Sequence, residues 1–465
     1  MNILFIYSST GKWELASQIL VPADAYLPPL GLLYLGRVLE DAGHHVEIID
    51  CNIEGFDTDR LQQKIRQADM IGMTVYTEPR EQRNTILIAH AIKHIAPDVP
   101  LVIGGPHCTL FPKESLQTHN ADISVPGEGV FCITKLIDAL GGKRPLSSVP
   151  GIYIKRKNGM ILKTKPDQQQ RTLDDIPFPA RHLVEKYEYG YMMGVKVMNG
   201  KVTTIITSRG CPNHCRFCQI HAIVPKYQTR SVENITAEIA EVLQQGYTTL
   251  VFVDDNFLAQ KKKAEQVMDF IIAQHVDIDI HIINARVDSA DRALYEKLRQ
   301  AGVVSINFGI ESGDQGVLDF YQKQITLQQI RTAVKLAREM GFFTCGNFIF
   351  GAPIETKTHI EKTIAFAKSL ALDSAHFFNL GFIYGSQLWK EEVAKGTIQP
   401  HEQWVLAESQ RGLGCFTNRQ LDQFNTKAYQ SFYFRPVHIL REVYKAVKNQ
   451  DFRYLLVGVK MALLQ

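Results

Sequence analysis

Short apolar runs alternate with amphipathic stretches along the first third of the chain. Residues 2–7 are rich in β-branched and aromatic side chains, and a helical period of apolar residues follows over 30–39. The same unit repeats until a last short strand at 123–125 and a helix at 130–140. This alternation predicts an α/β domain with a doubly wound parallel sheet, of the Rossmann-like type, over residues 1–142.

The loops that follow these predicted strands contain paired glycines and hydroxyl groups. Ligands bind doubly wound sheets at the carboxyl ends of the strands, and paired glycines let the backbone approach a ligand closely. The motifs GxGxxG and GxxxxGK[ST] do not occur here, which disfavours a dinucleotide or a nucleoside triphosphate. For His107, a merely hydrogen-bonded loop histidine is the competing interpretation. The candidate ligand contacts are Thr74, Thr77, Gly104, Gly105, His107, Gly127 and Glu128.

Residues 143–195 are punctuated by proline and glycine, and they predict a linker. Within this linker, alternating residues over 151–155 and 160–164 flank an Asn-Gly pair, which is typical of a β-hairpin.

A second series of strands and helices fills residues 196–400. Six strands with helices between them predict a partial (β/α)6 barrel that is open on one side, with the functional groups at the carboxyl ends of the strands. The predicted strands are 202–207, 249–253, 280–284, 304–308, 343–350 and 375–380.

Residues 401–465 break this alternation and predict a helical C-terminal region, with helices near 437–448 and 454–464. The aromatic side chains of this region favour core packing, and the alternative is a cap that shields the barrel mouth from water. No run reaches the ~18 apolar residues of a membrane span. The apolar end of the chain could touch a membrane, but membrane contact is not expected.

Composition and charge change this picture only slightly. A chain of 465 residues with 45% apolar content can bury two or three cores, and a net charge of +3 gives no indication of nucleic-acid binding. The first residues run directly into a strand without a targeting signal, so a cytoplasmic protein is expected.

One loop concentrates three of the eight cysteines. Cys211, Cys215 and Cys218 have CxxxCxxC spacing, between a predicted strand and a predicted helix. Three thiolates leave one coordination position open, and soft sulfur ligands select an iron–sulfur cluster, zinc or Cu(I). His214 or His221 could complete a three-Cys, one-His zinc site, which is the competing interpretation. The other cysteines are scattered and favour the role of small buried hydrophobes.

This loop resembles that of the radical SAM enzymes, in which three such cysteines hold a 4Fe–4S cluster and S-adenosylmethionine (SAM) binds the fourth iron. The strand ends downstream resemble that family in the same order. For the acidic pair after the second strand, a helix N-cap is the alternative, and for Glu311 it is a simple ion pair. The resemblance implies that the cofactor contacts include Asp254, Asp255, Arg286, Glu311, Ser312 and Gly351.

The first domain resembles the cobalamin-binding domain that precedes many radical SAM domains, including the stretch 26–32. One departure concerns the cobalt ligand. The DxHxxG motif, whose histidine binds cobalt from below, does not occur in this sequence. Bound cobalamin is therefore expected without a lower histidine ligand of that kind.

Together these resemblances imply a cobalamin-dependent enzyme similar to class B radical SAM methyltransferases. Such an enzyme would methylate an unactivated carbon of a small hydrophobic substrate and take electrons from a donor such as flavodoxin or ferredoxin. Within the family, the alternative is a cobalamin-dependent oxidative cyclase or rearrangement enzyme. From another class, the alternative is a non-enzymatic, zinc-stabilised binding protein. No catalytic side chain is assigned.

Overall fold

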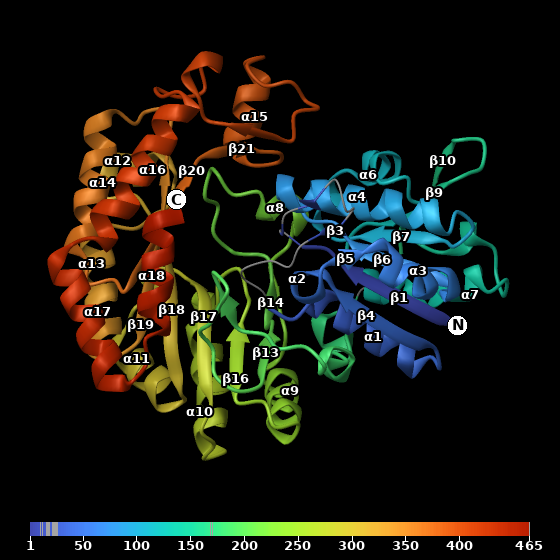
Figure 1. The fold of residues 1–465 in the computed structure, drawn as a ribbon, viewed down its shortest axis with the longest axis horizontal. Coiled ribbons are helices and arrows are strands. Elements are labelled where there is room, and N and C mark those ends of the chain that lie inside the picture. Colours follow the sequence, from blue (N-terminus) through green and yellow to red (C-terminus); the bar gives the residue numbers. More distant parts are fainter. Residues whose placement is uncertain are drawn as a thin grey trace. The chain divides into compact units, whose positions relative to one another are not determined.

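The computed structural model describes residues 1–9, 11, 13, 14, 19, 20, 27–167, 169 and 171–464 (Figure 1). The chain folds into two compact units, Met1–Gly194 and Val195–Gln465, and each contains its own large sheet. Both are α/β units with parallel strands, so the predicted fold class is confirmed. Tyr26, in the stretch that resembles a cobalamin-binding domain, lies outside the described residues.

The first unit is a doubly wound sheet whose strands follow the order β10-β9-β8-β7-β6-β1-β4. From β1 the chain passes to β4 on one side and then returns to β6 on the other. This reversal is the topological switch point, where doubly wound sheets bind ligands. Its main elements are β1 (Asn2–Tyr7), α1 (Leu30–Asp41), β4 (His45–Asp50), α3 (Thr58–Gln67), β6 (Met70–Thr74), α4 (Pro79–Ile95), β7 (Leu101–Gly104), α5 (Pro106–Leu110), α6 (Pro112–Thr118), β8 (Ile123–Val125) and α7 (Ile133–Leu140).

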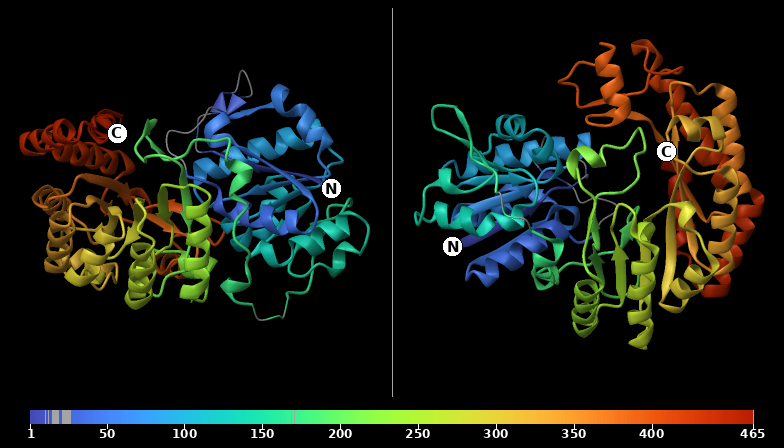
Figure 2. Two further views of the ribbon diagram at one scale, coloured as in Figure 1. Left: turned by 90° about the horizontal axis from the view of Figure 1, so that it is seen from below. Right: turned by 180° about the vertical axis from the view of Figure 1, so that it is seen from behind.

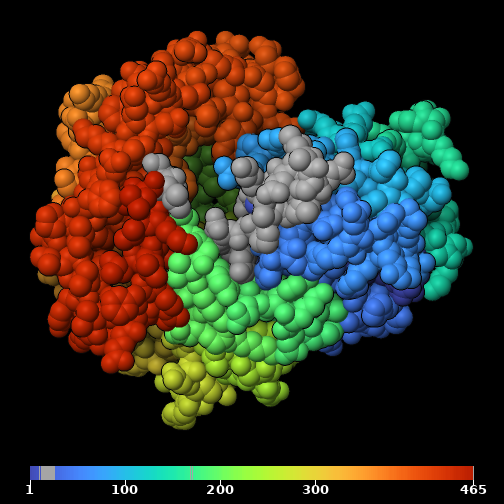
Figure 3. All heavy atoms as spheres, viewed as in Figure 1, coloured from blue at the N-terminus to red at the C-terminus, as the bar shows by residue number. Residues whose placement is uncertain are grey.

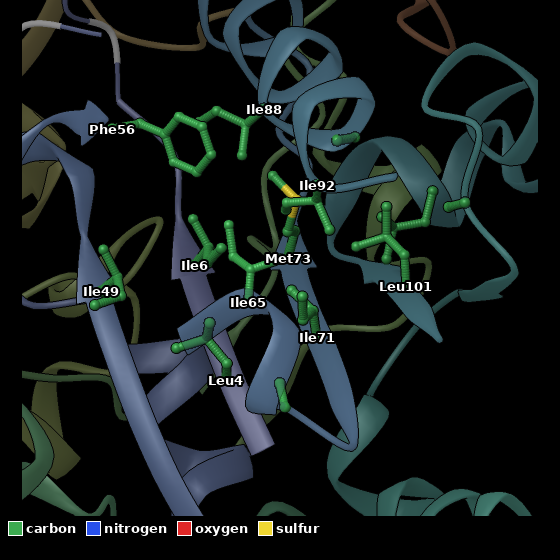
Figure 4. Packing of buried hydrophobic residues seen from close by; sticks show 14 of the residues in the cluster. Leu4, Ile6, Ile49, Phe56, Ile65, Ile71, Met73, Ile88, Ile92 and Leu101 are labelled. Carbon is green, nitrogen blue, oxygen red and sulfur yellow. The ribbon is translucent and has the colours of Figure 1, made fainter. Parts of the chain in front are cut away.

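Apolar side chains from these strands and from the helices packed against them, α3 and α4 above all, form one core on one face of the sheet (Figure 4). Ile6 of β1 and Ile71 of β6 pack with Ile65 of α3 and Ile88 of α4, and all four are fully or almost fully buried. Strands buried in this way need apolar residues at nearly every position, which explains the continuous apolar runs in the sequence.

The predicted hairpin forms between residues 151 and 164, as β9 (Tyr153–Lys155) and β10 (Ile161–Lys163). β9 also pairs antiparallel with β8, so the hairpin extends the first sheet by two strands. This segment is therefore part of the first unit, because its backbone hydrogen bonds complete the free edge of β8.

The second unit is a six-stranded parallel sheet in chain order, and its first and last strands do not pair with each other (Figure 2). This is the predicted partial barrel, with its helices along the outer face of the curved sheet. Its elements are β13 (Val202–Ile205), α9 (Val232–Gln244), β16 (Thr249–Phe252), α10 (Lys261–Ala273), β17 (Asp279–Ala285), α11 (Arg292–Gln300), β18 (Val303–Glu311), α12 (Gln315–Phe320), α13 (Leu327–Glu339), β19 (Phe343–Phe350), α14 (Lys357–Ser369) and β20 (Ser374–Asn379).

Polar side chains at the helix starts fix where these barrel helices begin. Ser231 accepts a hydrogen bond from the Asn234 amide at 3.1 Å and starts α9. Thr326 and Gln329 bond reciprocally at the start of α13, which is a capping box.

The open edge of the barrel is covered by α16 (Asn418–Tyr433). The Tyr433 hydroxyl accepts a hydrogen bond from the Ala375 amide at 3.1 Å, and the Tyr429 hydroxyl accepts one from the Phe377 amide at 3.2 Å. These hydroxyls satisfy backbone groups of β20 that have no neighbouring strand. The aromatic residues of the C-terminal region therefore pack against the edge strand, as core residues do.

Two further helices, α17 (Pro436–Asn449) and α18 (Arg453–Leu464), complete the C-terminal region near the predicted positions. The sequence pattern did not predict the small sheet of β21 (Gly381–Ile383) and β22 (Trp404–Leu406), nor α15 (Gln387–Ala394). No helix in the described part of the chain combines the length and the apolarity needed to cross a membrane.

Candidate functional site

The three cysteines lie in a half-buried loop that follows β13, and each sulfur has an N–H donor beside it. Asn213 Nδ2 lies 3.5 Å from Cys211 Sγ, and the Ile220 amide lies 3.5 Å from Cys218 Sγ. Arg286 Nη1 lies 3.8 Å from Cys215 Sγ. Hydrogen bonds to sulfur favour the anionic thiolate that a metal cluster requires and adjust the potential of that cluster.

Burial acts in the opposite direction on these thiols. It raises the pKa of Cys218 to about 11. It also raises the pKa of Cys215, where the charges of Lys323 and Arg286 oppose the effect. A coordinating metal deprotonates a thiol outright, so metal binding would overcome the effect of burial on Cys215 and Cys218.

The histidines of the loop are engaged with each other and with the backbone. The rings of His214 and His221 stack with their centroids 4.2 Å apart, and His221 Nε2 lies 2.8 Å from the Asn213 carbonyl oxygen. Among the described residues, no three His, Cys, Asp or Glu side chains converge closely enough to hold a single metal ion. A 4Fe–4S cluster makes a different demand, because each thiolate binds a different iron.

A cavity of about 400 Å³ lies at the carboxyl ends of the barrel strands. Pockets of this size hold small ligands. Alternate residues of the strands point into it, as with Asn347 and Ile349 of β19, while Phe348 and Phe350 between and beyond them are buried. Its lining consists of Phe217, Asp255, Asn284, Ala285, Arg286, Gly309, Glu311, Lys323, Asn347, Ile349, Phe378, Asn379, Leu380, Gly381, Ile383 and Trp404.

Of the residues predicted from the strand ends, Asp255, Arg286 and Glu311 line this cavity. The pKa of Asp255 is raised by burial and by the charge of Asp254. A cation bound in the cavity would relieve both effects, since it favours the ionised carboxylate.

Glu311 ends β18 in a left-handed backbone conformation, with φ of 67°, at a register shift between β18 and β19. Its Oε1 atom lies 2.5 Å from Lys323 Nζ, and both side chains are almost fully buried. Lys323 was missed by the sequence analysis, because it follows α12 rather than a strand. The cavity thus presents an anion and a cation side by side.

Arg286 is already held by the protein. Its guanidinium makes a two-pronged contact with Asp288, and its Nη2 atom donates to the Lys323 carbonyl oxygen at 2.7 Å. These contacts occupy the guanidinium of Arg286, and the cation that pairs with Glu311 is Lys323.

The other three predicted barrel residues lie around the cavity without lining it. Buried Asp254 accepts hydrogen bonds from the Thr207 amide and hydroxyl, at 3.1 and 2.7 Å, and so anchors the start of the cysteine loop. Ser312 lies 3.1 Å from the Thr363 hydroxyl. The Gly351 amide donates to Glu355 at 2.7 Å.

In the first unit, Thr74 and Thr77 lie at the end of β6, next to the switch point. Two residues that the sequence analysis missed accompany them: the hydroxyls of Tyr7 and Tyr76 lie 3.5 Å apart, at the ends of β1 and β6. Tyr7 is part of an apolar strand pattern, and Tyr76 lies in the loop after β6, between the two predicted threonines. The pKa of each is raised, mainly by burial.

Gly104 ends β7, and Gly105 follows it with φ of +97°. A side chain at Gly105 would lie 2.8 Å from Thr74 Cγ2, so only glycine fits this close approach of two strand ends.

His107 is buried, with Nδ1 bonded to the Ser115 hydroxyl at 2.8 Å and Nε2 to Gln82. Both ring nitrogens are used within the protein, which favours the interpretation as a hydrogen-bonded histidine. Gly127 and Glu128, after β8, are exposed.

Replacing Lys323 by Met should destabilise the second unit by about 3–5 kcal/mol, because Glu311 would remain buried without its partner. Adding Glu311→Gln should recover most of that loss in urea unfolding. As a matched control, Lys427→Met breaks the half-exposed pair with Glu361 and should cost less than about 1 kcal/mol. An equal loss of unfolding free energy in Lys323→Met and Lys427→Met would contradict the assignment of Glu311 and Lys323 as a buried ion pair.

Glu355 should make unfolding pH-dependent. Its pKa is raised from 4.5 to about 7 by burial. The folded state therefore holds the proton more tightly than the unfolded state, and stability falls as the pH rises from about 4.5 through about 7. Glu355→Gln lacks this loss, so between pH 5 and pH 8 it should gain up to about 3 kcal/mol relative to the wild type.

The control for this measurement is Glu402→Gln. Arg411 lowers the pKa of Glu402 to about 2, so this carboxylate stays ionised over the whole range. The difference in the free energy of unfolding between Glu402→Gln and the wild type should not change between about pH 5 and pH 8. A flat profile for Glu355→Gln as well would show that Glu355 ionises normally.

Comparison with known proteins agrees with this arrangement. Residues 205–367 match the radical SAM superfamily model, and residues 17–133 match the B12 binding domain model. The structure of the methyltransferase TsrM from Kitasatospora setae, with cobalamin and a 4Fe–4S cluster bound, has a similar fold. Its TM-score is 0.66 at 19% identity, covering 85% of this chain and 75% of that one.

Among curated relatives, an uncharacterised methyltransferase of Pyrococcus horikoshii is 31% identical over 428 residues, 90% of either chain. The anaerobic magnesium-protoporphyrin IX monomethyl ester cyclase of Rubrivivax gelatinosus is 27% identical over 81% of this chain and 67% of its own. These matches confirm the prediction of an enzyme and give no support to the zinc-stabilised binding protein. The chain belongs to the cobalamin-dependent radical SAM methyltransferase family, whose cofactors are a 4Fe–4S cluster, SAM and cobalamin.

Proposed function

We propose that this enzyme transfers a methyl group to an unactivated carbon of a small hydrophobic substrate. The observation that carries the proposal is the cavity beside the cysteine loop, which combines a buried ion pair with apolar walls. When bound, the cluster and SAM supply a radical that removes hydrogen from carbon, and methylcobalamin supplies the methyl group. In this proposal, residues 1–142 hold cobalamin, 196–400 carry the radical chemistry and 401–465 cover the barrel. Residues 143–195 link the two domains, and their β9–β10 hairpin also extends the first sheet.

Cys211, Cys215 and Cys218 would hold the cluster, since each sulfur already has an N–H donor. The amino-acid end of SAM carries one positive and one negative group. Glu311 and Lys323 offer the complementary charges, and Asp255 offers a second carboxylate for the amine.

The walls of the cavity support a dry reaction and a hydrophobic substrate. Ile349, Leu380 and Ile383 are apolar side chains of the lining, and water near a radical would give side reactions. Phe378 is 48% exposed and Trp404 is 37% exposed, although both are large and apolar. A substrate with an apolar or aromatic body would cover these two rings.

The carboxyl edge of the first sheet would hold cobalamin, with Thr74, Thr77 and Gly105 at the switch point. The corrin ring carries amide side chains, which pair with hydroxyl groups and backbone amides. His107 has no free ring nitrogen for cobalt, which supports binding without a histidine as lower ligand.

We further propose that a flavodoxin- or ferredoxin-type protein supplies the electrons and that the enzyme works in the cytoplasm. An oxygen-sensitive cluster that must be reduced before each turnover supports both parts of this proposal. A cobalamin-dependent oxidative cyclase is the second candidate, favoured by the similarity to the Rubrivivax enzyme. The products of the reaction decide between the two.

The decisive test uses protein reconstituted anaerobically with iron, sulfide and cobalamin. Supplied with a chemical reductant, with SAM that carries a deuterated methyl group and with an extract of a deletion strain, it should form a product bearing that label. Cys215→Ala should lose the cluster absorbance and SAM cleavage completely, because one cluster ligand is gone.

The matched control is Cys415→Ala, an exposed cysteine outside the loop, which should keep both properties. A colourless protein that binds zinc and ignores SAM would falsify the proposal. A substrate that loses hydrogen without gaining the label would favour the cyclase.

The cobalamin site has its own test, which does not depend on catalysis. Gly105→Ala should lower the amount of cobalamin retained after gel filtration at least tenfold, since a methyl group there meets Thr74. Gly142→Ala is the control: its φ of +79° imposes a similar backbone strain of about 1–2 kcal/mol, but no atom lies within 4 Å. Equal cobalamin retention by the two variants would place the site elsewhere.

A further inference from the structure

The helix α17 is amphipathic in the opposite sense to an ordinary surface helix. Its polar residues His438 and Glu442 are buried, whereas Val437, Leu440 and Tyr444 are 79%, 71% and 65% exposed. These apolar residues, with Val447, recur every three or four positions and so form one stripe. A surface helix normally turns such a stripe inward, whereas this stripe faces away from the protein.

Ion pairs explain why the polar side of α17 faces inward. Arg441 donates to the Leu372 carbonyl oxygen and to Glu442, and Lys445 pairs with Asp373 at the start of β20. These contacts fix the rotation of the helix about its axis. The outward position of the apolar stripe is therefore a property of the packed fold.

The neighbouring helix α18 continues the apolar surface. The two helices contact each other and are joined by a short link in which Phe452 is 50% exposed. Leu456, Val459 and Leu463 follow at helical spacing and are 53%, 45% and 68% exposed. Figure 3 shows this end of the chain, in red, as a broad continuous part of one face of the molecule.

The charge of the same segment is positive. Residues 435–465 contain six basic and two acidic side chains, a net charge of +4, while the whole chain carries only +3. Two of the six, Arg441 and Lys445, are paired on the inward side of α17. The exposed Lys448 and Lys460 lie next to the apolar stripes. A second copy of the chain is therefore a poor occupant, because an isologous contact would set this positive surface against itself. An anionic lipid surface complements both the charge and the apolar side chains.

We propose that the α17–α18 face docks this enzyme onto the surface of an anionic membrane. Helices of 14 and 12 residues are too short to span a bilayer. They can lie in the interface, with the apolar stripes among the acyl chains and the lysines at the headgroups. This attachment is independent of the methyl-transfer chemistry. It differs from the expectation from sequence, in which membrane contact is possible but not expected.

The test is sedimentation of the full chain with vesicles. The wild type should bind phosphatidylcholine vesicles that contain phosphatidylglycerol, bind pure phosphatidylcholine at least tenfold more weakly, and dissociate as salt is raised. Leu440→Glu with Tyr444→Glu should abolish binding. Lys448→Glu with Lys460→Glu should weaken binding to the anionic vesicles alone.

The matched control is Met160→Glu, which changes an apolar residue of similar exposure, 56%, in the β9–β10 hairpin. It should bind vesicles like the wild type. Circular dichroism and cluster absorbance should be unchanged in all the variants, because every substituted side chain is exposed. Equal binding by the wild type and the Leu440/Tyr444 variant would overturn the proposal. So would a dimer in light scattering that disappears in that variant while no vesicle binding is seen.

Discussion

The site depends on one buried carboxylate, Asp254, which binds the residues at the start of the cysteine loop. Asp254 follows β16 and accepts hydrogen bonds from both the amide and the hydroxyl of Thr207, and from the hydroxyl of Ser208. A carboxylate without solvent is costly unless its oxygens are satisfied, so these bonds hold Asp254 and the loop in one arrangement. Because Thr207 and Ser208 directly precede the cysteine loop, these hydrogen bonds also fix the position of the cysteines. Asp254, which resembles a cofactor contact in the sequence, thus stabilises the cysteine loop without lining the cavity.

The far side of the loop is held by Arg216. Its amide donates to the Tyr321 carbonyl oxygen at 3.0 Å, and its guanidinium contacts the Phe320 carbonyl oxygen and Glu391. These bonds connect the loop to the segment after α12, which also carries Lys323. The cation of the cavity and the sulfur ligands are therefore placed by the same contacts, and their distance from each other cannot change freely.

A partial barrel leaves one strand edge without a partner, and this enzyme covers it with α16. Tyrosine hydroxyls take the place of a neighbouring strand along β20. The next helix, α17, then has its polar side drawn inward by Asp373, which turns its apolar stripe outward. Closing an open sheet in this way creates the apolar surface on the outside of the barrel. The way in which the β20 edge is covered thus determines which side of α17 is exposed.

The sequence by itself determined the order of strands and helices, the cysteine motif and the polar strand ends. Each of these features depends only on the spacing of residues that are close together in the chain. Periodicity identifies which side of an element is apolar, and CxxxCxxC needs no information beyond its own loop. Four features required the tertiary structure: the addition of the β9–β10 hairpin to the first sheet, the pairing of Glu311 with Lys323, the commitment of Arg286 to Asp288, and the outward face of α17. Each of these features depends on contacts between groups that are distant in the sequence. A buried charge or a free strand edge pairs with whichever group lies next to it after the chain has packed, so only the tertiary structure identifies the partner.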